Sequence, residues 1–159
     1  MRALVASVAV LVLAGCSGSS SGSAAVQPGP SSSAPACTRL LNKVPATLLG
    51  LKHADSAARG ATAWGEHAGH TIVLRCGVTP PTATTSPCIT TDDVDWIFDE
   101  TGTAYVFTTF GREPAVEVSV PKSISREQAP GAMAALAGAV KPLPQGRHCT
   151  DLDDVPSSS

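Results

Sequence analysis

The N-terminal end of the chain carries its most specific chemical signal, a cysteine that follows a short apolar stretch. Arg2 precedes a largely apolar stretch from Ala3 to Leu13, and two small residues then lead to Cys16. This stretch is too short to cross a bilayer as a helix, which needs about 20 residues. A charged start, an apolar middle and a small-residue end are typical of a cleaved secretory signal, so the segment predicts export.

Leu13-Ala14-Gly15-Cys16 resembles the lipobox of bacterial lipoproteins. The resemblance implies cleavage before Cys16, a diacylglyceryl group on its sulfur and acylation of its new amino group. Two or three acyl chains anchor a protein stably, whereas one chain holds it only marginally. We therefore expect Cys16 to be the lipidation site of a membrane-anchored protein that has no spanning helix. An ordinary secretory signal with a chance cysteine is the alternative.

Four further cysteines predict disulfide bonds, because an even number in an exported chain usually pairs. Among the three possible connectivities we favour Cys76–Cys88 with Cys37–Cys149. The first pair would close a proline-rich loop, and the second would join the two ends of the domain, which are often close in space. A zinc site is the alternative, which we disfavour because the sequence contains no Cys-x-x-Cys spacing.

Ser119 and Lys122 match the Ser-x-x-Lys motif of penicillin-binding proteins and β-lactamases. That chemistry needs the serine at a helix N-terminus and partner motifs such as Lys-Thr-Gly. Here Ser119 is expected in a strand, Pro121 opposes a helical turn, and no Lys-Thr-Gly occurs. The sequence therefore identifies no catalytic residue, and we lean against an enzyme.

His67 and His70, with a neighbouring glutamate, are the best candidates for metal ligands. Glycines flank the pair, which indicates a solvated loop rather than a formed site. The aspartates near residues 92–100 and 151–154 lack the spacing of a calcium loop. We expect neither a metal nor a cofactor.

Arg75, Arg112 and Trp64 are the side chains that could line a ligand site. An arginine on a sheet presents a fork of donors that suits a carboxylate or a phosphate, and the indole could complete an anion or glycan site. The structural alternative, which we favour, is a salt bridge to Glu113, Glu117 or a strand aspartate. We expect Arg75 to be structural, in an apolar strand, and Arg112 to be exposed at a hairpin tip.

Periodicity predicts four strands that would hold these residues. Residues 93–99 alternate aspartates with apolar side chains, which predicts a half-buried strand with its acids outward. Residues 71–76, 103–110 and 116–120 are rich in β-branched and aromatic residues. Short links between the later segments suit hairpins, so these strands should pair antiparallel.

Helices are expected at both ends of the domain. Residues 37–44 carry an apolar face and stop before Pro45. A second helix should have Pro130 near its first turn and an apolar stripe at Met133, Leu136, Ala137 and Val140. The predicted fold is α+β: an antiparallel sheet of about four to five strands with N- and C-terminal helices on one face, and two disulfides. Residues 45–70 stay unassigned.

Composition divides the chain into a signal at 1–15, a lipidated cysteine with a Ser/Gly/Pro tether at 16–36, one α+β domain at 37–152 and a tail at 153–159. The tether and the tail bury too little apolar surface to offset their ordering entropy, so we expect them to be disordered. The 11 basic and 13 acidic side chains form no basic run, so no nucleic-acid partner is expected.

Several short segments resemble an uncharacterised family of actinobacterial secreted lipoproteins: Pro45-Ala46-Thr47-Leu48, Trp64-Gly65, Leu74-Arg75-Cys76-Gly77-Val78, Thr108-Thr109-Phe110-Gly111-Arg112 and Pro114-Ala115-Val116-Glu117-Val118. The resemblance implies an exported, lipid-anchored protein, and it offers no activity, cofactor or catalytic residue to transfer. We expect a non-catalytic binding or accessory module on the outer face of the cell membrane, which contacts an envelope protein or a cell-wall component. A small envelope hydrolase or transferase is the alternative.

Overall fold

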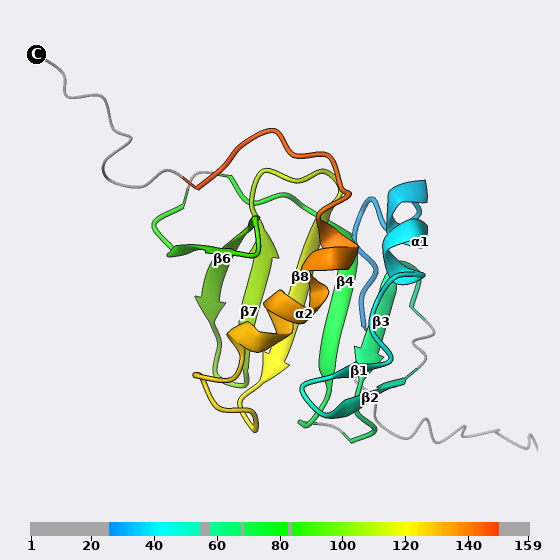
Figure 1. The fold of residues 1–159 in the computed structure, drawn as a ribbon, viewed down its shortest axis with the longest axis vertical. Coiled ribbons are helices and arrows are strands. Elements are labelled where there is room, and N and C mark those ends of the chain that lie inside the picture. The colour runs from blue at the N-terminus through cyan, green and yellow to red at the C-terminus, as the bar shows by residue number, and fades with distance from the viewer. Residues whose placement is uncertain (1–25, 55–57, 68, 83, 150–159) are drawn as a thin grey trace, which may run out of the picture.

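The computed structural model describes residues 26–54, 58–67, 69–82 and 84–149. Eight antiparallel strands form one sheet in the order β1-β2-β3-β4-β8-β7-β6-β5 (Figure 1). The strands are β1 (Thr47–Leu48), β2 (Leu51–Ala54), β3 (Ala61–Trp64), β4 (Ile72–Val78), β5 (Cys88–Thr91), β6 (Val94–Glu100), β7 (Ala104–Thr109) and β8 (Ala115–Pro121). The predicted sheet of four to five strands is therefore wrong: the fold is mostly sheet, with two short helices. The predicted signal, Cys16 and the predicted tail at 153–159 lie outside the described residues.

The four strands that periodicity predicted are present as β4, β6, β7 and β8. Those it missed are short, and two or four residues are too few to show an alternation. The two aspartates that link β5 to β6 are, however, typical of a hairpin turn. Asp92 and Asp93 adopt φ values of 48° and 60°, and two such residues in a row form the hairpin turn whose twist matches its strands. Aspartate tolerates that conformation better than most residues.

The two helices, α1 (Pro35–Leu41) and α2 (Pro130–Val140), pack on one face of the sheet, where Figure 1 shows α2 in front of β7 and β8. α1 ends before Val44, earlier than predicted, whereas α2 begins at the proline expected near its first turn. None of the helices in the described ranges is long and apolar enough to span a membrane.

The core lies between the helices and this face of the sheet. Its largest fully buried side chains include Trp64, Trp96 and Met133. Alternate residues along β6 and β8 point into it, because successive side chains of a strand face opposite sides. Burial of each large apolar side chain contributes about 1.5–3 kcal/mol, so this layer is the main source of stability.

The opposite face of the sheet is reached by the 141–149 segment, which follows α2. This segment passes the hairpin between β7 and β8, where Glu113 N–H donates to Pro144 O and Gly146 N–H donates to Gly111 O. Figure 1 shows it running over the end of the sheet toward β6. It thereby brings its last described residues onto the face that the helices leave uncovered.

Candidate ligand-binding groove

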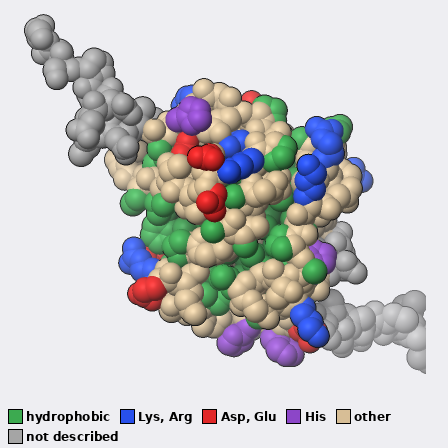
Figure 2. All heavy atoms as spheres, in the orientation of Figure 1, with side chains coloured by type: hydrophobic (Ala, Val, Ile, Leu, Met, Phe, Trp, Pro, Cys, Tyr) green, Lys and Arg blue, Asp and Glu red, His purple; other side chains and the backbone are tan. Residues whose placement is uncertain are grey.

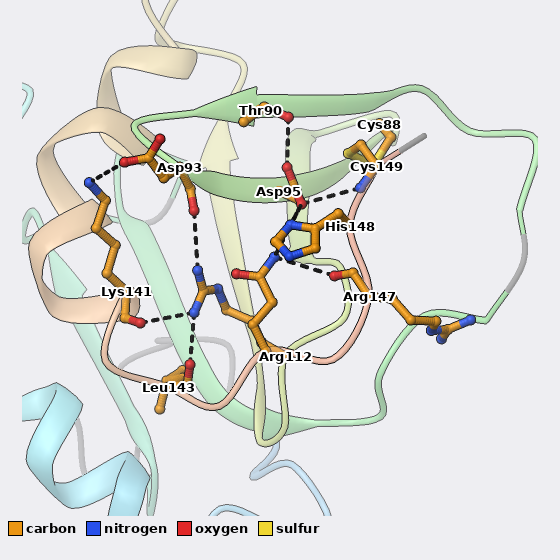
Figure 3. A network of polar contacts seen from close by, with 11 residues as sticks. Cys88, Thr90, Asp93, Asp95, Arg112, Lys141, Leu143, Arg147, His148 and Cys149 are labelled. Carbon is orange, nitrogen blue, oxygen red and sulfur yellow. Dashed lines mark hydrogen bonds and ion pairs between the residues drawn. A yellow bond between two sulfur atoms is a disulfide. The ribbon is translucent and has the colours of Figure 1, made fainter. Parts of the chain in front are cut away.

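Asp95 is the hub that holds the 141–149 segment on this face (Figure 3). The side chain belongs to β6 and is buried, with the residue 3% exposed. Its Oδ1 accepts a hydrogen bond from Thr90 Oγ1 at 2.6 Å. Its Oδ2 lies 3.2 Å from Gln145 Nε2, 3.1 Å from His148 Nδ1 and 3.2 Å from the backbone nitrogen of Cys149. The prediction that this acid points into solvent is wrong, because the 141–149 segment covers it.

Arg112 is buried, so the prediction that it is exposed at a hairpin tip is wrong. Its Nη1 donates to Lys141 O at 3.0 Å and to Leu143 O at 2.8 Å, and its Nη2 donates to Asp93 O at 3.2 Å. Burial lowers the pKa of the guanidinium, while the charge of Asp95 acts in the opposite direction. The side chain therefore ties the β7–β8 hairpin to the end of α2 and to the β5–β6 turn.

Arg75 forms a salt bridge with Glu117, as the structural interpretation predicted. Its Nη2 lies 2.6 Å from Glu117 Oε1, and its Nη1 donates to Gln27 O at 3.1 Å. Trp64 is in the core, where its Nε1 donates to Pro45 O at 2.8 Å. Arg75, Arg112 and Trp64 thus lie in three different environments and do not combine into one ligand surface.

Both predicted disulfide pairings are wrong. The bonds join Cys37 to Cys76 and Cys88 to Cys149. Cys76 points into the core, where α1 supplies Cys37, whereas Cys88 pairs in register with Ile97 on the opposite face. A loop closed between Cys76 and Cys88 would have to join two opposite faces of the sheet.

A groove of about 950 Å³ opens on this opposite face, beside the second disulfide. Ile97 and Phe110 supply apolar surface, and the disulfide between Cys88 and Cys149 lies along it. The rest of its lining is formed by three hydroxyl-bearing residues, one proline, one arginine and one histidine: Thr84, Thr85, Ser86, Pro87, Arg147 and His148. Its volume suits a small molecule or a short peptide segment.

Arg147 supplies the charged side chain of the groove lining. Arg147 is exposed, its guanidinium lies 5.0 Å from the centroid of the Phe110 ring, and its Nη2 lies 3.4 Å from Pro81 O. Figure 3 shows it pointing away from the contacts of Asp95. Within the described residues no carboxylate forms an ion pair with Arg147. Sequence reasoning missed Arg147 and His148, because nothing in the pattern places Gly146-Arg147-His148 beside Phe110.

The residues predicted as possible metal ligands or as a serine nucleophile have no partner residues for that chemistry among those described. His67 and His70 lie in a turn in which His70 N–H donates to His67 O. No group of three metal-ligating side chains occurs in the described ranges. Ser119 is in β8, and the Lys122 ammonium pairs with Glu100 at 2.9 Å rather than activating a serine.

The face of the sheet that carries the helices exposes little apolar surface against which a ligand could be buried. Figure 2 shows hydrophobic side chains near the middle of this face with charged ones around them. Leu49, at 38% exposure, is the only large hydrophobic side chain that is exposed among the residues described. The green surface in Figure 2 therefore consists of small or partly covered side chains, and the groove is the stronger candidate.

Comparison with known proteins relates this chain to a family and to no individual curated protein or solved structure. Neither the curated proteins nor the solved structures contain a significant match to this chain. A family described as "Protein of unknown function (DUF3515)" matches residues 1–148, which is nearly the whole chain. The two disulfides and the eight-stranded sheet thus lie within a chain that belongs to the DUF3515 family.

Proposed function

We propose that this protein is a lipid-anchored module on the outer face of the cell membrane, of the actinobacterial lipoprotein kind, and that it binds a ligand in the groove between Phe110 and Cys88–Cys149. Two disulfides support an oxidising environment outside the cytoplasm. The family match begins at residue 1, so it includes the apolar leader and Cys16. The proposal of a lipid anchor depends on the Leu13-Ala14-Gly15-Cys16 motif.

Replacement of Cys16 by alanine should release the protein from membranes, because its sulfur and amino group carry every proposed acyl chain. We expect the native protein in the detergent phase of a phase-separation assay and the Cys16→Ala protein in the aqueous phase. Metabolic labelling with a fatty acid should disappear in the variant. Unchanged partitioning of the variant would contradict lipid anchoring.

The observation that carries the binding role is the composition of the groove. An apolar floor at Ile97 and Phe110 lies below an exposed arginine that has no ion pair among the described residues. Apolar burial supplies affinity, and a guanidinium selects a carboxylate through two parallel hydrogen bonds. The ligand class is therefore an apolar carboxylate, such as an acidic peptide segment of an envelope protein or of the cell wall.

Replacement of Arg147 by alanine should weaken binding of the probe 1-naphthylacetate, an aromatic carboxylate, by about five- to tenfold. Amide chemical shifts of isotope-labelled protein would give both the Kd and the residues involved. Arg59→Ala is the matched control, because Arg59 is also exposed and does not line the groove. Equal affinities of the native protein and Arg147→Ala, or shifts confined to other regions, would refute this ligand class.

A hydrolase or transferase remains the second candidate because of one contact. The Nδ1 of His148 lies 3.1 Å from the buried carboxylate of Asp95, the arrangement by which an acid orients a catalytic imidazole. Among the described residues, however, no serine or cysteine is hydrogen-bonded to His148 Nε2, and all four domain cysteines are oxidised. Ester hydrolysis that is lost in His148→Ala would favour the enzyme over the binding module.

A further inference from the structure

The two disulfides differ in their access to solvent. Cys37 and Cys76 are both 0% exposed and belong to the core. Cys88 is exposed, Cys149 is partly exposed, and both line the groove. Cys88 also lies on β5, which has one neighbouring strand in the described sheet, so its outer edge is open. A thiol in solution can therefore approach one bond and not the other.

Cys88–Cys149 is also the strongest restraint on the end of the described chain. The noncovalent restraints nearest to it are the contacts of Asp95 Oδ2 with Gln145, His148 and Cys149, at 3.1–3.2 Å. These distances lie at the long end of the ordinary N–H···O range of about 2.7–3.2 Å, so the contacts are weaker than short charge-assisted hydrogen bonds of about 2.7–2.9 Å. Opening of the disulfide would leave the groove-lining residues Arg147 and His148 held by noncovalent contacts alone, which also include the hydrogen bond from Gly146 N–H to Gly111 O at 2.8 Å and the contact of Arg147 with the Phe110 ring.

We propose that Cys88–Cys149 is a thiol-exchange site whose reduction by an envelope dithiol loosens the wall of the groove and lowers its affinity for ligand. The effect on affinity rests on the proposed function, whereas selective reduction does not. The buried bond between Cys37 and Cys76 stays intact and preserves the fold during the reaction.

The exchange conserves atoms and electrons. A thiolate of the dithiol attacks Cys88 Sγ, a mixed disulfide forms, and Cys149 leaves as a thiolate that takes up a proton. The second thiol of the reductant, as its thiolate, then attacks the mixed disulfide and releases Cys88. The reductant is oxidised to a disulfide, and two electrons pass to the protein.

Selective reduction is tested on the full chain in detergent with dithiothreitol as the dithiol. Iodoacetamide then traps free thiols, and peptide mapping identifies them. We expect Cys88 and Cys149 to be alkylated at a dithiothreitol concentration about tenfold or more below that needed for Cys37 and Cys76. Protein unfolded in denaturant is the control, in which accessibility no longer separates the two bonds. Simultaneous alkylation of all four cysteines in the folded protein would overturn the proposal.

The effect on the groove is measured with 1-naphthylacetate before and after selective reduction. We expect the Kd to rise about fivefold or more, and the Cys88→Ser/Cys149→Ser protein to bind like reduced protein and not respond to dithiothreitol. An unchanged Kd after selective reduction would overturn the regulatory part. Absence of binding to oxidised protein would instead refute the proposed function and leave the thiol-exchange site standing.

Discussion

Replacement of Arg112 by alanine is expected to lower the free energy of unfolding by about 3–5 kcal/mol, because it removes charged hydrogen bonds from a buried site. Three backbone carbonyls, of Asp93, Lys141 and Leu143, accept from its two Nη atoms. Without the guanidinium these acceptors stay buried with no donor, and a cavity remains. Urea unfolding at constant pH measures the loss.

Two further variants isolate the cause of this loss. Arg112→Lys keeps the charge but lacks the planar fork that bridges carbonyls of separate segments, so we expect an intermediate loss. Arg147→Ala removes an exposed arginine from the neighbouring segment and should change stability by about 1 kcal/mol or less. If Arg112→Ala and Arg147→Ala were equally stable, Arg112 would not tie these segments together as the structure indicates.

Loss of the buried disulfide is expected to be comparably severe. Chain entropy predicts that the Cys37→Ala/Cys76→Ala protein loses about 4 kcal/mol, since the bond spans 39 residues. The bond also fastens α1 to β4 inside the core, so its loss affects the packing of both elements. Urea unfolding of protein made under oxidising conditions would measure this effect.

The second disulfide provides a matched comparison. Cys88–Cys149 spans 61 residues, so chain entropy alone predicts a slightly larger loss. We expect about half the loss found for the buried pair, because the freed end can fray while the rest of the protein stays folded. If Cys88→Ala/Cys149→Ala lost more unfolding free energy than Cys37→Ala/Cys76→Ala, the length of the closed loop would matter more than the fraying of the freed end.

Local pattern was enough to predict the longer elements. Alternation predicted β6 and β8, and an apolar stripe behind Pro130 predicted α2. These patterns work because one face of each element is buried, which imposes a period on the sequence. The same reasoning failed for β1, β2, β3 and β5, where two to four residues cannot display a period.

The candidate groove was beyond prediction for a different reason. Asp95 occupies a position that alternation assigns to solvent, and only the path of the 141–149 segment over it makes it a buried hub. Arg147 and Phe110 are 37 positions apart, and their stacking depends on the same path. No local signal in the sequence contains that information.

The sequence by itself determined the features that a short segment can express: the strand and helix periodicities, the number of cysteines and the leader motif that predicts export. The tertiary structure decided which cysteines pair, that Arg112 is buried and where a groove forms. Each of these depends on which face of the sheet a residue occupies and on which distant segment covers it. Those relations come from long-range packing of the whole chain, because a side chain's partners are set by the fold and not by its neighbours in sequence.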